Sequence, residues 1–520
     1  MSILACKKDK NATITPTPAP TLATRDELSK DSLFLYAKDV YLWNDALPAV
    51  EVFKPRSFTA SSKQLTNLNS ELFAITQFKI NPTTGKPYEY IADGNGQQIL
   101  EPKYSYIEDL VASGKLTYAP NLQASVGLDG QGNDFGLALS ATGSNTDYQI
   151  YLRFASPGSP ASLAGLGRGD RINKINGTSL GTNFNSEVDF INNALDATKQ
   201  TSVQLGGIKR NGTTYSVTLT KVKYTSSPIY KDSIYTVGSK KIGYFAYARF
   251  SNTENSFIAL DNIFSKFVTA GVTDLVVDLR YNGGGYVSTA QHLINLIVPT
   301  AQNGKVMFAQ AYNSTMQSGA PAILRNQPVR DQSGKIQYSN GRIVTYADYS
   351  YSVADNTEKI QKTSGLTNVG KVVFITTGGT ASASELVINS LKPYVDVKTV
   401  GKTSYGKPVG FSPIRIDKFD VYMSMFSSTN SAGEGNYFAG FTPNSEKTDD
   451  VTRDFGNTSE TCLAAALGYI DTGVFPSSTA SNQTMSIKGT TTSSANVTVR
   501  DVFSPPSFKG MIDIPHTRIK

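Results

Sequence analysis

The chain has 520 residues, with 49 lysines and arginines against 42 aspartates and glutamates, and a formal net charge of +7. Hydrophobic residues make up 39% and charged residues 18%, a composition typical of globular proteins with a sizeable core. The length allows about three domains of roughly 100–200 residues each. Lysine and arginine form no dense cluster, which argues against nucleic acid as a partner. No segment approaches about 18 consecutive apolar residues, so we expect no membrane-spanning helix.

Cysteine and histidine are too few for several kinds of site. The two cysteines, Cys6 and Cys462, lie far apart, which excludes a disulfide framework. The two histidines, His292 and His516, form no cluster with cysteine at metal-ligand spacing. We therefore expect neither a metal site nor a cofactor.

Residues 1–24 combine an early cysteine with a threonine- and proline-rich stretch. The segment ILAC at residues 3–6 resembles the end of a bacterial lipoprotein signal, whose cysteine is lipidated after cleavage. The charged start and the apolar region of about 7–15 residues that a full signal needs are not present. We expect a signal remnant and tether with Cys6 lipidated, in the bacterial cell envelope, at the outer membrane or in the periplasm. The alternative is a disordered tail with a free thiol.

Residues 25–122 are predicted to form a helical N-terminal module. Apolar residues from Leu33 to Trp43 recur close to helical spacing, Asp31 is a plausible N-cap, and Pro48 marks the end. We expect Trp43, the only tryptophan, to belong to the core.

Residues 124–223 show a different pattern, which is rich in strands and turns. A glycine-containing turn leads into a strand at 135–139, and a helical turn at 162–166 precedes a tight turn at 167–170. A strand and hairpin follow at 172–177. The order and separation of these motifs resemble a PDZ domain of the bacterial protease type.

This resemblance implies a site for a peptide carboxy-terminus, bound as an added strand beside the glycine loop. The candidate peptide-binding residues are Phe135, Gly136, Leu137, Ala138 and Leu139. The alternative is a docking domain without a peptide site.

From about residue 224 to 474 the pattern is α/β, so the fold class predicted for the whole chain is multi-domain α/β. Strands are predicted at 242–250, 275–280, 372–375, 395–400 and 421–427, and helices at 256–270, 288–298, 381–391 and 460–469. Residues 300–370, with a hairpin at 335–348, are expected to be an insertion near the active-site mouth. Residues 475–520 are expected to form a polar tail, and the pattern does not indicate whether its last residues dock.

The segment 371–410 places a hydroxyl and a lysine at positions suited to chemistry. Ser382 follows a buried strand at the start of a helix, so the turn exposes its hydroxyl and the first N–H groups of the helix can receive an oxyanion. A serine nucleophile needs a base. His292 lies on an apolar helix stripe and His516 near residue 520, and neither is a strong candidate. Lys407 serves if burial lowers its pKa, although a lone loop lysine is ordinarily a solvated charge.

Three motifs together carry a family resemblance: Asp278-Leu279-Arg280 with the glycines 283–285, Ser382-Ala383-Ser384-Glu385, and Gly406-Lys407. With the preceding PDZ-like module they resemble the carboxyl-terminal processing, or tail-specific, proteases, a Ser/Lys family, over roughly residues 124–470. The resemblance implies a crotonase-like core of ββα repeats, with Ser382 as nucleophile and Lys407, 25 positions later, as general base. It also implies a backbone oxyanion hole made by Ala383 with Gly284, or with Gly285.

Other residues of these motifs have weaker claims. Ser384 is the alternative nucleophile and Glu385 an accessory carboxylate, whereas Asp278 and Arg280 are expected to shape the loop under the site. The family often carries a glutamine four residues after the lysine, which orients it. Here that position is Phe411, so the group that orients Lys407 is open.

The expected function is a serine endopeptidase that acts on unfolded or flexible proteins through an acyl-enzyme on Ser382. Its partners would be protein or peptide substrates, engaged through their C-termini, and a membrane only through a lipid anchor. The alternative is an inactive peptide- or ligand-binding protein of the same fold, motivated by Phe411 and by the long insertion.

Overall fold

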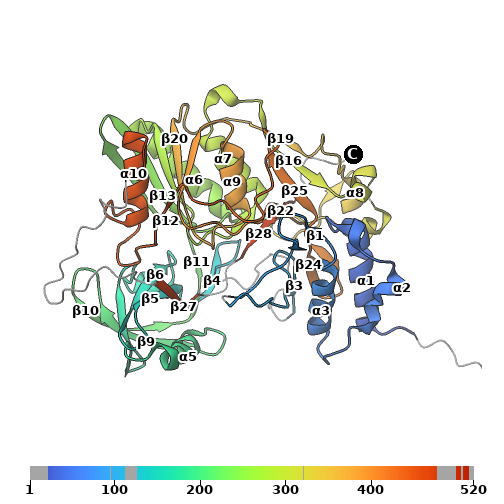
Figure 1. The fold of residues 1–520 in the computed structure, drawn as a ribbon, viewed down its shortest axis with the longest axis horizontal. Coiled ribbons are helices and arrows are strands. Elements are labelled where there is room, and N and C mark those ends of the chain that lie inside the picture. The colour runs from blue at the N-terminus through green and yellow to red at the C-terminus, as the bar shows by residue number, and fades with distance from the viewer. Residues whose placement is uncertain are drawn as a thin grey trace, which may run out of the picture.

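The computed structural model describes residues 22–93, 95–111, 126–319, 321–476, 499–504 and 508–514. In Figure 1 the N-terminal module and the second module lie at opposite ends, and the α/β core lies above and between them. Cys6 and His516 fall outside the described residues. No helix in the described ranges is long and apolar enough to cross a membrane.

The N-terminal module starts earlier than the predicted cap. The Thr24 hydroxyl accepts the Glu27 N–H and the Glu27 carboxylate accepts the Thr24 N–H, so this capping box starts the helix. Asp31 as N-cap is therefore wrong; its carboxylate pairs with Arg56. Trp43 is 8% exposed and belongs to the core, as expected. The elements are α1 (Arg25–Val40), η1 (Asn44–Ala46), α2 (Val50–Phe53), η2 (Pro55–Ser57), α3 (Gln64–Thr76), β1 (Ile80–Asn81), β2 (Lys86–Pro87) and β3 (Tyr106–Asp109).

The module is not only helical, because its last strand joins the core. β3 pairs antiparallel with β24 (Phe419–Tyr422), which in turn pairs with β23 (Ile414–Ile416). The segment that leads into β3 is thereby held against the core.

The second module is built on a sheet of order β10-β9-β7-β6-β5-β27, the last strand of which is β27 (Val499–Phe503). Its buried residues form a cluster separate from that of the core. The elements are β4 (Gln131–Asp134), β5 (Leu137–Gly143), β6 (Tyr148–Ala155), α4 (Pro160–Leu163), β7 (Arg171–Ile175), β8 (Thr178–Ser179), α5 (Phe184–Leu195), β9 (Ser202–Ile208), β10 (Thr214–Thr220) and β11 (Val222–Thr225).

The core is a six-stranded sheet of order β12-β13-β14-β20-β21-β26, parallel from β13 onward. Alternate residues face opposite sides: Leu275 and Val277 pack toward α6, α7 and α9, and Val276 packs toward α10. Figure 1 shows α10 apart from the other three helices. The elements are β12 (Ile229–Val237), β13 (Lys240–Tyr247), α6 (Thr253–Ala270), β14 (Asp274–Asp278), β15 (Gly284–Tyr286), α7 (Val287–Ile297), β20 (Lys371–Thr376), α9 (Ala383–Leu391), β21 (Asp396–Gly401), β26 (Ser445–Glu446) and α10 (Thr461–Thr472).

A second sheet, of order β19-β16-β25-β22, lies beside the first. Its strand β16 comes from within residues 300–370. The expected insertion therefore contributes a strand to the core. The elements are η3 (Thr300–Gln302), β16 (Val306–Tyr312), α8 (Ser314–Ser318), η4 (Ala322–Asn326), β17 (Tyr338–Ser339), β18 (Arg342–Ile343), η5 (Tyr346–Asp348), β19 (Thr357–Lys359), β22 (Val409–Gly410) and β25 (Phe426–Asn430).

The expected polar tail contains two docked strands. β27 pairs with β5 of the second module, and β28 (Gly510–Ile512) pairs with β15 of the core. Met511 and Ile512 are almost completely buried, and the burial of their apolar side chains stabilises the docked position of β28.

Candidate active site

Ser382 lies at the junction that the sequence predicts, between β20 and α9. It is the N-cap of α9 and has φ 61° and ψ −110°, a conformation that costs a non-glycine residue strain. The side chain is fully buried, and its Oγ has no hydrogen-bond partner among the described residues. A strained strand-to-helix turn with an uncommitted hydroxyl is the local geometry of a serine nucleophile.

The glycine loop after β14 is tied to this turn through Asn282. The backbone carbonyl of Asn282 accepts the Ala381 N–H at 3.1 Å and the Ser384 hydroxyl at 3.0 Å. Gly284 has φ 105°, and a Cβ atom on it would lie 2.9 Å from the Ala381 oxygen and 3.0 Å from the Ala383 nitrogen, so this position requires glycine. The predicted oxyanion residues Ala383 and Gly284 are therefore neighbours.

The two glycines differ as donors. The Gly284 N–H donates to the Asn282 side-chain oxygen at 3.0 Å and is therefore engaged. Gly285 carries the next N–H on β15, and the parallel register of β15 with β28 directs that N–H toward β28. The Gly285 N–H thus faces β28, whereas the Gly284 N–H is held within its own loop.

Glu385 connects the nucleophile turn to the lysine loop. Its Oε2 accepts the backbone N–H groups of Ser382 at 2.9 Å and Lys407 at 2.8 Å. Its Oε1 accepts the Ser404 hydroxyl at 2.6 Å and the Gly406 N–H at 2.7 Å. Burial raises the pKa of this carboxyl, whereas the hydrogen bonds that it accepts lower it. One carboxylate thus sets the spacing between the two candidate catalytic residues.

Lys407 is completely buried and its amine is held by backbone oxygens. The Nζ atom donates to the carbonyls of Tyr104 at 2.9 Å and Lys509 at 3.0 Å, and lies 4.4 Å from the centre of the Phe411 ring. Burial, above all, lowers the pKa of Lys407 to about 7. The position where a glutamine was expected is filled by an aromatic face, and two main-chain carbonyls orient the amine.

The Tyr104 carbonyl is itself fixed by Glu89, which the sequence did not single out. The buried Glu89 carboxylate accepts the N–H groups of Tyr104 at 3.2 Å and Ser105 at 2.8 Å, and also the Ser105 hydroxyl. Two further hydroxyls, of Tyr41 and Ser424, donate to the same carboxylate. The bond from Ser424 joins residues 335 positions apart, which no local pattern signals.

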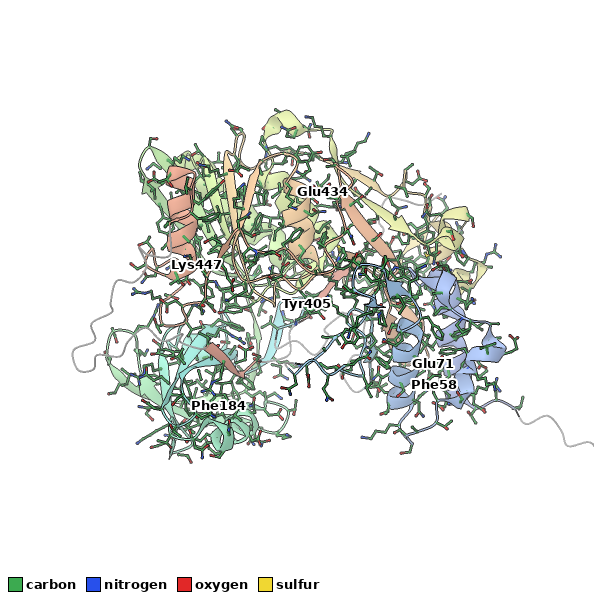
Figure 2. All side chains as sticks on the ribbon, viewed as in Figure 1. Phe58, Glu71, Phe184, Tyr405, Glu434 and Lys447 are labelled. Carbon is green, nitrogen blue, oxygen red and sulfur yellow. The ribbon has the colours of Figure 1, made fainter. Side chains whose placement is uncertain are left out.

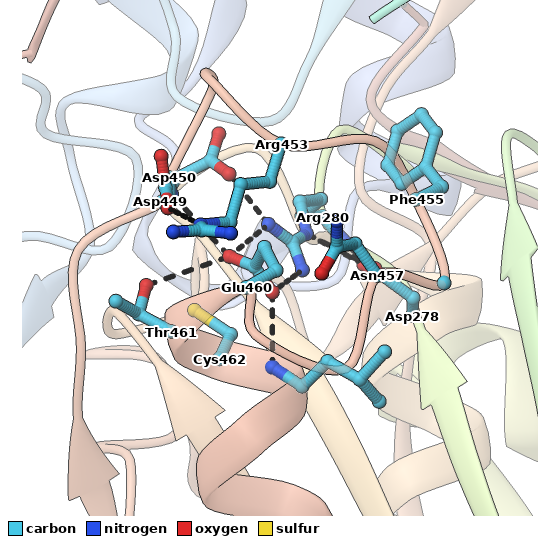
Figure 3. A network of polar contacts seen from close by, with 12 residues as sticks. Asp278, Arg280, Asp449, Asp450, Arg453, Phe455, Asn457, Glu460, Thr461 and Cys462 are labelled. Carbon is cyan, nitrogen blue, oxygen red and sulfur yellow. Dashed lines mark hydrogen bonds and ion pairs between the residues drawn. The ribbon is translucent and has the colours of Figure 1, made fainter. Parts of the chain in front are cut away.

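Arg280, which shortly precedes the glycine loop in the chain, lies in a buried ionic network (Figure 3). It pairs with Asp278 at 2.9 Å and Glu460 at 2.9 Å, and it shares Asp449 with Arg168 of the second module. Burial alone would raise the pKa of Asp449, but Arg168 and Arg280 hold it below its usual range. The network joins the loop that follows β14 to the second module.

The remaining predicted residues lie elsewhere or have other contacts. His292 pairs with Asp261 at 2.8 Å and stacks on Phe257, on α7 and α6. Ser384 is committed to the glycine loop. Phe135 to Leu139 are buried, and the last three of these residues begin β5. No group of three or more possible metal-ligating side chains occurs in the described part of the chain.

The Lys407 loop lies where the N-terminal module meets the core. Tyr405, labelled near the centre of Figure 2, donates its hydroxyl to the Lys103 carbonyl at 2.8 Å. The Tyr104 hydroxyl in turn donates to the Gly406 carbonyl at 2.8 Å. The N-terminal module therefore contributes directly to the position of the lysine.

Residues 241–446 match the model of peptidase family S41. The segment includes the glycine loop, Ser382 and Lys407, and the match supports a serine-peptidase family for the α/β core.

Two curated relatives agree with the family match. A chloroplastic C-terminal processing peptidase of Tetradesmus obliquus is 24% identical over 289 residues, which cover 53% of this chain and 52% of the relative. A "probable CtpA-like serine protease" of Staphylococcus aureus (strain bovine RF122 / ET3-1) is 24% identical over 282 residues, 54% of this chain and 46% of the relative. The chain thus matches about half the length of these relatives.

The fold has a solved counterpart. A crystal structure assigned to an S41 protease of Bacteroides fragilis NCTC 9343 superposes with a TM-score of 0.53 at 21% identity, and the match covers 86% of this chain and 98% of that one. At this identity the likeness concerns the fold alone.

Proposed function

We propose that the protein is a serine endopeptidase of the carboxyl-terminal processing type, with Ser382 as nucleophile and Lys407 as general base. The observation that carries the proposal is the pair itself: a strained, uncommitted serine and a buried lysine with a pKa of about 7, joined by the hydrogen bonds of one carboxylate. The match of this segment to peptidase family S41 supports the same assignment.

The contacts of Lys407 suit the role of a base. A neutral amine has two N–H bonds and one lone pair. The Tyr104 carbonyl can accept one N–H bond. The Lys509 carbonyl accepts the other in this structure, in a place that a carbonyl of a bound strand could also take, and the lone pair is then left for the Ser382 proton. In this scheme Lys407 accepts the proton of the Ser382 hydroxyl as that oxygen attacks a peptide carbonyl, and then passes the proton to the leaving amine.

The oxyanion formed by this attack would be stabilised by the N–H groups of Ala383 and Gly285. Both belong to backbone that is fixed before the reaction, so no reorganisation is needed as charge develops. Water activated by Lys407 would then hydrolyse the acyl group from Ser382.

The second module is proposed to engage the carboxy-terminal part of a protein substrate along the edge that begins at Phe135–Leu139. The support is that β27 already pairs with β5 along this edge, so the edge can accept an added strand. A lipid anchor at Cys6, and with it a place in the cell envelope, is likewise proposed, and labelling with a radioactive fatty acid that Cys6→Ser abolishes would support it.

The direct test is cleavage of denatured casein by the wild type and by Ser382→Ala. The wild type should cleave and Ser382→Ala should not, while His292→Ala, a matched change outside the site, should cleave at the wild-type rate. Equal activity of Ser382→Ala would remove Ser382 as the nucleophile. An inactive wild type whose Ser382 also resists a serine-reactive phosphonate would favour a ligand-binding protein of the same fold.

A further inference from the structure

The edge of the second module proposed to receive a peptide already holds one from the same chain. β27 adds to β5 in antiparallel register, with Val499 opposite Thr142 and Phe503 opposite Leu139, and it contacts α5. Val502 is 4% exposed within the module's apolar cluster, and Asp501 pairs with Arg153. β27 thus lies as a bound peptide would in β-strand addition.

A second strand of the same chain lies in the candidate active site. β28 pairs in parallel with β15, so that Gly284 is opposite Gly510, and the Gly510 N–H donates to the Gly283 carbonyl at 3.0 Å. On its other edge, the Phe411 N–H donates to the Met511 carbonyl at 3.0 Å. The strand therefore fills the space between the oxyanion loop and the loop that carries Lys407.

The carbonyl groups of this strand point at the catalytic groups. The Lys509 carbonyl accepts a hydrogen bond from Lys407 Nζ. The Gly510 oxygen lies 2.4 Å from the position that a Cβ atom on Gly284 would take, and the Ala383 nitrogen lies 3.0 Å from the same point. The Gly510 carbonyl is therefore beside the proposed oxyanion donors, where the carbonyl of a bound substrate belongs.

We propose that β27 and β28 together are an internal occupant of the peptide-binding path, and that a substrate binds by displacing them strand for strand. This inference rests on the proposed function, because it identifies the path with that of the substrate. In this structure β27 and β28 fill the substrate-binding path. They therefore compete with substrate and limit turnover until they are displaced.

The occupant also indicates which residue fits at the reacting carbonyl. A Cβ atom on Gly510 would lie 2.7 Å from the Phe411 ring and 2.3 Å from Phe508, a side chain of the occupant itself. Once the occupant has left, Phe411 remains, so the path should favour glycine at this position over residues that carry a Cβ atom.

Displacement can be measured without catalysis. The probe is a fluorescein-labelled synthetic peptide with the sequence of residues 499–514, and the protein is full-length Ser382→Ala. Adding Met511→Lys, which places a charge in the buried strand, should tighten binding of the probe at least tenfold. Adding Asp501→Ala, which removes the pair with Arg153 at the module's edge, should tighten it less but in the same direction. Glu446→Ala, which removes the exposed pair with Lys402, is the matched control and should change nothing.

The outcomes separate this inference from the proposed function. Equal affinity in all variants, or no binding to any of them, would overturn the internal occupant. Asp501→Ala alone decides the matter if Met511→Lys does not fold. If weakened variants bind the probe more tightly but the wild type cleaves no protein, the occupant stands and the peptidase assignment fails. If the wild type cleaves casein and the weakened variants gain no affinity, the peptidase assignment stands and the internal occupant fails.

Discussion

At the residue scale, Lys407 is the side chain whose environment matters most. Burial disfavours its ammonium form, and nearby Lys103 and Lys509 act in the same direction. Glu89 and Glu385 oppose this effect, yet the pKa still falls to about 7. Burial therefore outweighs the two carboxylates, and a large fraction of the amine is neutral near neutral pH.

The pH dependence of the reaction should report this lysine. The base must be neutral to accept the Ser382 proton, so the rate of acylation should fall as pH drops below about 7 and reach a plateau above it. Stopped-flow acylation by an activated ester across pH 5–9 would measure the midpoint. In Lys407→Met the rate of acylation should fall by a factor of roughly 10²–10⁴, and the pH midpoint near 7 should disappear.

Glu385 should matter for both stability and rate. Glu385→Gln replaces one accepting oxygen by an NH₂ group, which leaves backbone N–H groups of the Ser382 turn and the Lys407 loop without an acceptor. Each such buried donor costs about 1–3 kcal/mol. We expect a lower Tm in thermal unfolding together with slower acylation. A variant with an unchanged Tm and rate would show that Glu385 does not hold the two loops.

At the scale of elements, the site depends on segments that come from different parts of the chain. The Tyr104 carbonyl reaches Lys407 because β3 pairs with β24 and Glu89 holds the turn before β3. Glu89 acts on Lys407 only through this turn and through its charge, and is thus a positioning residue.

Removing the charge of Glu89 should move the pH profile in a defined direction. Its negative charge favours the ammonium form and raises the pKa of Lys407. Glu89→Gln should therefore shift the midpoint of the acylation profile to lower pH, while loss of a hydrogen-bond acceptor at Tyr104 or Ser105 lowers the plateau. A lower plateau with an unmoved midpoint would leave Glu89 a purely structural role.

At the scale of the whole molecule, the second module is fixed to the core through buried charges. Arg168 reaches from that module to Asp449, which Arg280 also contacts. Both arginines are about 2% exposed, so solvent screens these pairs little.

Breaking this connection should be costly. Arg168→Ala leaves Asp449 with one of its two cations and should lower the free energy of unfolding by about 3–5 kcal/mol, as for other buried pairs from which one partner is removed. Denaturant unfolding measures this change. The exposed pair of Lys402 and Glu446 provides the comparison, and Lys402→Ala should cost no more than about 1 kcal/mol. Similar costs for the two variants would contradict a structural role for the network.

The sequence predicted the local setting of Ser382 and Lys407 better than it predicted the residues that support them. Ser382 and Lys407 stood out because strand-to-helix turns and glycine-flanked loops have local signatures. Thr24 and Glu27 have the capping-box spacing, a local signal that outranks Asp31 as the start of α1. Tyr104, Glu89 and Lys509 act through backbone carbonyls or through contacts across hundreds of residues. Such contacts depend on the closed tertiary structure, which periodicity and spacing do not encode.

The docked position of β28 could not be foreseen for the same reason. Its three residues pair with a glycine loop more than 200 positions earlier, and its apolar run is too short to distinguish a buried strand from a loop. Phe411, an unexplained departure in the sequence, has a clear place in the structure as the aromatic face beside Lys407 and the neighbour of β28.

The central claim is that Ser382 is a nucleophile activated by Lys407. The most direct measurement is the rate at which a peptidyl phosphonate labels Ser382, followed by intact-mass spectrometry from pH 5 to 9. We predict one label per chain, located on Ser382, with a rate that rises through a midpoint near 7 and is lost in Lys407→Met. Labelling that is absent, that lies on another residue, or that is unchanged in Lys407→Met would contradict the claim.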